Sequence, residues 1–254
     1  MKVIYPDNII SLSADEEDAN YPVENLQDDH PKKVWRGTSK DAKLSLAVSS
    51  GAGIGIANTN AVSITITLKG GTTATWQTGI TWGDGVAWAP HIEQTVAGKY
   101  ALNENGVGML WAEYLSQTGM HFIDIDLTAG EGQTIEAGVL RAGPVLSFRD
   151  PLGIKEGLHD YSIEEETNNG AFYYRKRDIV RTFDFSVRVN RDDDFYTFMH
   201  TVARARGKRP LMYLVSSGIG TWEWAVYGRF QQLPGGGHDY KRHSVVGIKL
   251  IEVV

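Results

Sequence analysis

The pattern that decides the fold of this 254-residue chain is Thr182-Phe183-Asp184-Phe185-Ser186-Val187-Arg188-Val189. Its aromatic and aliphatic residues occupy every second position, which predicts a strand with one buried face. A helical pattern follows at about residues 192–206. It starts with three aspartates that suit a helix N-terminus, and it carries one apolar stripe: Phe195, Phe198, Met199 and Val202. Gly207 and Pro210 predict its end.

Strand patterns surround this helix in the second half of the chain. Leu211–Val215 is apolar throughout, which predicts a strand buried on both faces, and alternating patterns recur at residues 221–228 and 245–254. We expect the glycine-rich segment Gln231–Gly237 to form a flexible turn. Residues 144–254 therefore predict a mainly antiparallel β domain with one α-helix laid across it.

The first half, residues 1–143, predicts a β-sandwich without helices. Alternating strands are expected at residues 44–48, 62–68 and 121–127, and Trp35 is expected to plug the end of the sandwich. Between the first two strands lies Gly51-Ala52-Gly53-Ile54-Gly55-Ile56, which resembles a dinucleotide-binding loop. No helical pattern follows it, so we expect a glycine-rich loop without that function.

Charge separates the two halves. Residues 1–143 contain 9 Lys/Arg and 17 Asp/Glu, whereas residues 144–254 contain 16 and 14. An acidic first half argues against a specific nucleic-acid partner, because phosphate binding needs clustered cations. The absence of cysteine excludes disulfides and zinc–thiolate sites. The N-terminus lacks a signal-peptide pattern and no stretch is long and apolar enough to span a bilayer, so we expect synthesis in a cytoplasm without membrane insertion.

The first candidate functional residues lie between residues 164 and 181. Three consecutive glutamates, residues 164–166, precede the turn signal Asn168-Asn169-Gly170, and a basic group follows, namely Arg175, Lys176, Arg177 and Arg181. Such a pattern could contact an anion, but a solvated hairpin arm or a contact with an acidic neighbouring subunit is the favoured interpretation. Asn168, Asn169 and the four basic residues are therefore candidates for a subunit interface.

A second candidate group contains Trp76, Trp82, Asp84 and Trp88, beside a Trp82-Gly83-Asp84-Gly85 turn. Tryptophans in such a cluster either fill a β-sandwich, anchor a protein interface or stack on sugar faces. Burial is the favoured interpretation, and a glycan-binding site is the alternative.

Enzyme and metal signals are weak. Asp124 and Asp126 share one strand face, which we interpret as solvated, and the basic residues inside His238–His243 argue against a metal site there. No serine-nucleophile elbow, His-Glu-x-x-His motif or phosphate loop is present. We therefore expect a protein without a cofactor, a metal or an enzymatic activity.

The order of elements in the second half resembles that of distal-tail and related tail-tip proteins of long-tailed bacteriophages. The resemblance is carried by Arg181–Val189, Asp192–Gly207, Pro210–Val215, Glu223–Gly228 and Ser244–Val253. The first half resembles a galactose-binding-like, discoidin-type jelly roll through Tyr21–Leu26, Val34-Trp35-Arg36 and Ile135–Gly143. Members of that family commonly carry a cysteine bridge, which this chain lacks, so no ligand-binding residues are transferred.

This resemblance implies a structural protein of a virion tail tip or baseplate. Such a protein forms a ring of identical copies, probably six, that joins the tail tube to the hub or receptor-binding parts. Its implied partners are other copies of itself and the tail tube and hub proteins. A carbohydrate-binding module or adhesin that contacts host surface glycans is the alternative function.

Overall fold

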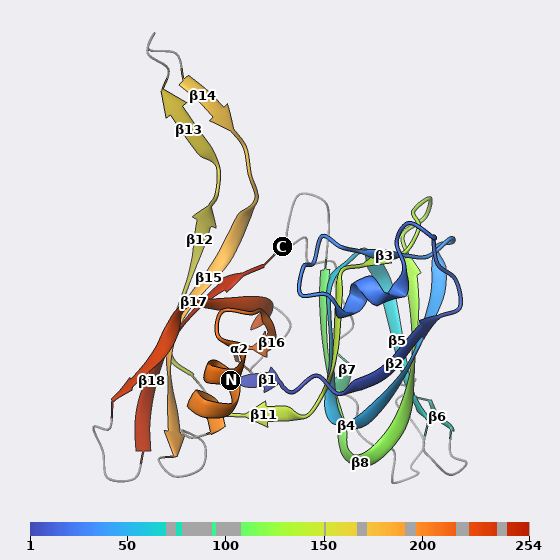
Figure 1. Ribbon diagram of the computed structural model, residues 1–254, viewed down its shortest axis with the longest axis horizontal. Coiled ribbons are helices and arrows are strands. Elements are labelled where there is room, and N and C mark those ends of the chain that lie inside the picture. Colours follow the sequence, from blue (N-terminus) through green and yellow to red (C-terminus); the bar gives the residue numbers. More distant parts are fainter. Residues whose placement is uncertain are drawn as a thin grey trace, which may run out of the picture.

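The computed structural model describes residues 1–69, 75–77, 93–94, 108–149, 151–166, 172–190, 197–216, 224–237 and 243–253. The protein is mainly β, with antiparallel sheets and one short helical segment (Figure 1), as the sequence predicts. Two seven-stranded sheets form its body, and a narrow hairpin projects from it.

The first sheet to consider is built almost entirely by the second half of the chain. Its strand order is β11 (Val145–Ser147), β1 (Lys2–Ile4), β16 (Leu211–Leu214), β17 (Ala225–Gly237), β18 (His243–Glu252), β15 (Ile179–Asn190) and β12 (Pro151–Asp160). The predicted strand at residues 182–189 lies inside β15, where Phe183, Phe185, Val187 and Val189 are buried. All four residues of β16 are buried, as expected for a strand covered on both faces.

The helical segment covers one face of this sheet. It consists of a π-helical stretch, η2 (Thr197–Ala203), followed by one turn of α-helix, α2 (Arg204–Arg206). Phe198 and Val202 are buried in the same core cluster as Phe183 and Phe230. Gly207 ends the helix with a φ of 57°, which glycine adopts without strain. The predicted helix start at residues 192–196, including Phe195, lies outside the described residues.

The other large sheet belongs to the first half. It contains β2 (Ile9–Ala14), β4 (Asp41–Thr59), β5 (Ala61–Lys69), β6 (Thr75–Gln77), β7 (Glu93–Gln94), β8 (Gly108–Ala129) and β10 (Val139–Gly143). The long strands β4 and β8 pair along their length and bend together, so the sheet curls around a core (Figure 1). A 3-10 helix, η1 (Val23–Gln27), and the small sheet of β3 (Trp35–Arg36) and β9 (Glu136–Ala137) adjoin this core. Trp35 is fully buried there, as predicted.

Three sequence expectations need correction. The segment Gly51–Ile56 is part of strand β4 and not a loop, since β4 stays paired with β8 and β10 across it. The segment Gln231–Gly237 is part of β17 and not a flexible turn, because bulges let its glycines stay paired with β18. Residues 2–4 were assigned with the first half, yet β1 lies between β11 and β16 in the other sheet.

Glycines in β4 explain how the two large sheets approach each other. A Cβ atom on Gly55 would lie 2.8 Å from Cγ of Met212, and one on Gly53 would lie 2.5 Å from Cγ2 of Val145. Both neighbours belong to the second-half sheet. A third apolar cluster joins residues of both sheets, among them Ile4, Trp111, Met212 and Tyr227. The glycine pattern therefore serves close packing of one sheet on the other.

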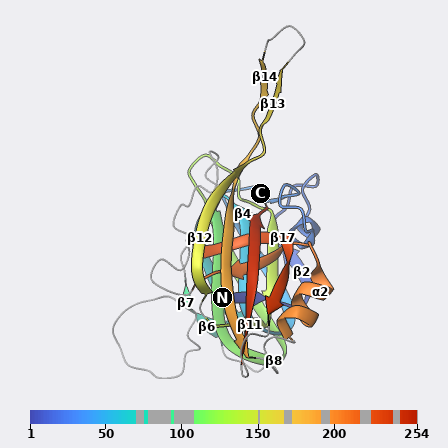
Figure 2. The ribbon, with the colours of Figure 1, turned by 90° about the vertical axis from the view of Figure 1, so that its left-hand side faces the viewer.

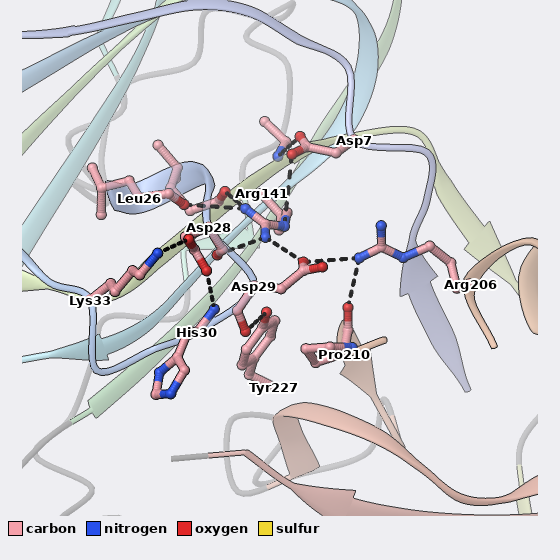
Figure 3. Close-up of polar contacts among 12 residues, drawn as sticks. Asp7, Leu26, Asp28, Asp29, His30, Lys33, Arg141, Arg206, Pro210 and Tyr227 are labelled. Carbon is pink, nitrogen blue, oxygen red and sulfur yellow. Dashed lines mark hydrogen bonds and ion pairs between the residues drawn. The ribbon is translucent and has the colours of Figure 1, made fainter. Parts of the chain in front are cut away.

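Polar contacts reinforce this junction (Figure 3). The guanidinium of Arg141 is buried and donates to the carbonyls of Leu26 and Asp28 and to Oδ1 of Asp29, the last at 2.8 Å. Asp29 also accepts from Arg206, which comes from α2. Burial raises the pKa of the nearby Asp7 carboxyl, against the opposing effect of the Arg141 charge.

Candidate functional site

The hairpin arm is the most distinctive feature of the molecule. Strands β12 and β15 leave the edge of the second-half sheet as an antiparallel pair, and the chain continues into β13 (Ile163–Glu166) and β14 (Phe172–Arg175). These two strands form a sheet of their own that points away from the body in both views (Figures 1 and 2). The arm therefore exposes both of its faces over the described residues.

Large apolar side chains lie on the surface of this arm. Leu158 is 74% exposed, Tyr173 60%, Tyr174 54% and Ile179 48%. Exposed apolar groups gathered on one projecting element are typical of an interaction surface, since a monomer gains nothing by leaving them in water. Tyrosine in particular combines a large apolar ring with a polar hydroxyl, which suits a protein interface.

Register determines which charges accompany these tyrosines. Glu164 lies opposite Tyr174, Glu165 lies opposite Tyr173, and Ile163 lies opposite Arg175. Glu164 and Glu165 are both exposed and point to opposite faces of the two-stranded ribbon. The tip of the arm thus combines acidic and aromatic groups on each face.

Arg181 anchors the base of the arm. Its Nη2 donates to Oε1 of Glu252 at 2.8 Å and to the carbonyl of Ala225 at 3.2 Å, and its guanidinium lies over the ring of Phe183. The Glu252 side chain is only 3% exposed. These contacts tie β15 to β17 and β18, so Arg181 points into the fold rather than toward a neighbour.

A cleft of about 500 Å³ lies beside the base of the arm. Ten residues line it, of which five are basic and two acidic: Lys32, Tyr161, Arg175, Lys176, Arg177, Asp178, Val180, Arg229, Glu252 and Val253. Both acidic residues already bind a cation within the chain, because Asp178 pairs with Lys32 at 2.6 Å and Glu252 pairs with Arg181. The cleft consequently presents an excess of positive charge.

The structure brings some of the predicted site residues together. Arg175, Lys176 and Arg177 line the cleft at the base of the arm, and Arg181 lies nearby but is held by Glu252. Asn168 and Asn169 lie outside the described residues. So do Trp82, Asp84 and Trp88 of the second candidate group. Trp76 lies in β6 opposite Leu68 of β5, which places its backbone in the first-half sheet.

Asp124 differs from its interpretation as a solvated residue. It is 5% exposed, forms an ion pair with Lys69 and accepts a hydrogen bond from Ser45 at 2.9 Å. Burial opposes its ionisation, but the hydrogen bonds from Lys69 and Ser45 outweigh burial and hold the pKa of this carboxyl below its ordinary value. Asp124 is thus a structural ion-pair partner on the face opposite the core.

Several residues of the arm and cleft could not be singled out from the sequence. Lys32, Arg229 and Glu252 come from three distant segments and meet only in the fold. Tyr173 and Tyr174 were visible as a pair, and their place between two charged segments was the available signal. Within the described part of the chain, no group of three metal-ligating side chains occurs, and no helix there is long and apolar enough to cross a membrane.

Comparison with known proteins adds little to this picture. No protein-family model matches the chain, and no curated protein matches it. A solved structure described as reduced XRCC1 bound to the DNA polymerase β catalytic domain aligns with 55% of this chain and 99% of that chain. Its sequence identity is 10% and its TM-score 0.34. A likeness at this level carries no argument about function.

Proposed function

We propose that this protein is a structural subunit of a bacteriophage tail tip or baseplate, and that identical copies assemble through the projecting arm. The resemblance of the second half to distal-tail proteins supplies the class of assembly. The arm supplies the observation that carries the proposal, since its exposed Leu158, Tyr173, Tyr174 and Ile179 lack a covering surface among the described residues. The assembly would be part of the virion, joining the tail tube to the hub or receptor-binding proteins.

Symmetry supports a ring. An arm that leaves one edge of the body and contacts a different surface of the next copy makes a heterologous contact, and such contacts close into rings when the rotation between copies allows it. Six copies are the number that the resemblance implies. Copies joined this way need no cofactor or metal.

The arm can be removed without disturbing the sheet that bears it. Asp160 and Ile179 are cross-strand partners at the point where β12 and β15 separate from the body. Replacing residues 161–178 with Asn-Gly would close these strands with a two-residue hairpin turn. The main loss inside the fold is the exposed ion pair between Lys32 and Asp178, which contributes little to stability.

Native mass tests the proposal. We expect the full chain to form an oligomer by light scattering and the arm-replaced chain to remain a folded monomer with an unchanged thermal transition. A full chain that stays monomeric at every concentration up to the solubility limit would count against self-assembly. An arm-replaced chain that still assembles would show that a different surface carries it.

A further inference from the structure

The charge of the cleft at the base of the arm calls for an anionic partner. Arg175, Arg177 and Arg229 line it and are exposed, and the structure shows no ion pair between them and any described residue. The two acidic lining residues are already paired within the chain. An anionic group that entered the cleft would therefore meet cations that have no competing partner in the described fold.

The same chain carries a matching acidic element. Glu164 and Glu165 are exposed in β13, and neither forms an ion pair with a described residue. Because β13 is an edge of a two-stranded ribbon, its two glutamates project from both faces. A ribbon that enters a cleft edge-on places one glutamate against each wall.

An arm cannot place β13 in its own cleft. β13 is paired with β14 from Ile163 to Glu166, and the ribbon leads away from the body (Figure 1). Folding β13 back would break this ladder. The acidic strand of a second copy, by contrast, can approach the cleft without any internal rearrangement.

Apolar groups on the two surfaces also match. Tyr173 and Tyr174 accompany the glutamates on the arm, and Tyr161, Val180 and Val253 contribute to the cleft. Aromatic anchors provide affinity, whereas complementary charges provide orientation and fast association.

We propose that β13 of one copy, with Glu164 and Glu165, docks into the cleft formed by Arg175, Arg177 and Arg229 of the next copy. This inference rests on the proposed function, because it specifies how the arm joins neighbouring copies. Each copy offers one acidic strand and one basic cleft, so the contact propagates head to tail, as ring closure requires.

Two charge-reversed variants test the contact. The strand variant E164K/E165K keeps the cleft, and the cleft variant R177E/R229E keeps the strand. In either variant alone, like charges meet, so we expect self-association about a hundredfold weaker than in the native chain. In a 1:1 mixture, a basic strand meets an acidic cleft and an acidic strand meets a basic cleft. Assembly should therefore return, with the two variants in equal amounts.

Controls separate this contact from a general effect of charge. Glu24→Lys and K208E/R209E alter exposed charges outside the arm and the cleft, and both should assemble as the native chain does. The native chain is measured beside them. A monomeric native chain would contradict the proposed function itself. A native oligomer with unaffected strand and cleft variants, or with a mixture that fails to assemble, would overturn only the docking of β13.

Competition by a polyanion is the remaining arm of the test. A fluorescent single-stranded oligonucleotide is titrated into the native chain and into R177E/R229E at low salt. We expect no binding that depends on the cleft when the strand of a neighbour occupies it. Binding that disappears in R177E/R229E, while self-assembly stays at the native level, would assign the cleft to nucleic acid and overturn the proposal.

Discussion

Arg206 and Asp29 are separated by 177 residues in the chain, yet Nη2 of Arg206 lies 3.1 Å from Oδ1 of Asp29. The same carboxylate oxygen accepts from the buried Arg141 at 2.8 Å (Figure 3). Asp29 thereby joins α2 of the second half to β10 of the first. With the apolar cluster around Met212 and Trp111, this contact couples the sheet that bears the arm to the other large sheet.

Replacing Asp29 should weaken this junction. In Asp29→Ala, Arg141 keeps its carbonyl acceptors but loses its nearest carboxylate, and Arg206 keeps only the carbonyl of Pro210. We expect the free energy of unfolding to fall by about 2 kcal/mol, because charge-assisted hydrogen bonds near a buried cation are lost. Chemical denaturation measures this change. The matched control is Asp28→Ala, whose exposed pair with Lys33 contributes less; an equal loss in both variants would contradict the special role of Asp29.

Two buried tyrosines should respond differently to loss of the hydroxyl. Tyr213 has no hydrogen-bond partner for its hydroxyl among the described residues, whereas the hydroxyl of Tyr227 donates to the carbonyl of Asp29 at 2.9 Å. Burial raises the pKa of both phenols, so both are neutral. We expect Tyr213→Phe to leave stability unchanged or to increase it slightly. Tyr227→Phe should cost about 1 kcal/mol, since it leaves a carbonyl without its donor. Thermal unfolding of both variants compares them directly, and the reverse order would contradict the assigned contacts.

Close packing at the end of β10 should make Gly143 intolerant of a side chain. A Cβ atom there would lie 2.1 Å from the carbonyl oxygen of Pro6, a backbone atom that cannot turn away. We expect Gly143→Ala to destabilise the protein by about 1–3 kcal/mol. Gly235 in β17 has no atom within 4 Å of such a Cβ, so Gly235→Ala should have little effect. Denaturant midpoints of the two variants decide the matter, and a stable Gly143→Ala protein would contradict the contact.

Asp7 should make stability depend on pH in a specific direction. Its pKa is raised from the ordinary 3.8, chiefly by burial. Its protonated form therefore stabilises the fold fully below that value, and this contribution is lost as the pH rises through the higher pKa of the folded state. We expect Asp7→Asn to gain stability relative to the native chain when the pH rises from about 3.5 to 7. Unfolding free energies of both proteins across this range give the difference, and a relative loss over the same range would contradict the direction.

The sequence was informative where periodicity matches burial. The alternation at residues 182–189 predicted β15, and the uniform apolarity of Leu211–Val215 predicted a strand covered on both faces. Glycine was misleading, because a sequence cannot distinguish a turn from a place where two sheets touch. Gly53 and Gly55 belong to the second case.

The candidate site was visible only in part. The basic group at residues 175–177 and the preceding glutamates predicted a charged hairpin, but the cleft also needs Lys32 and Arg229 from remote segments. Arg181 looked like its neighbours in the sequence, yet the buried Glu252, 71 residues away, holds it inside the fold. Long-range pairs of this kind leave no local pattern.

Electron microscopy of the native assembly tests the central claim most directly. The account predicts a closed ring in which the arm of each copy crosses to the next copy and its tip lies at the base of the neighbouring arm. Copies that assemble with their arms in solvent, or that pair symmetrically through another face, would contradict it.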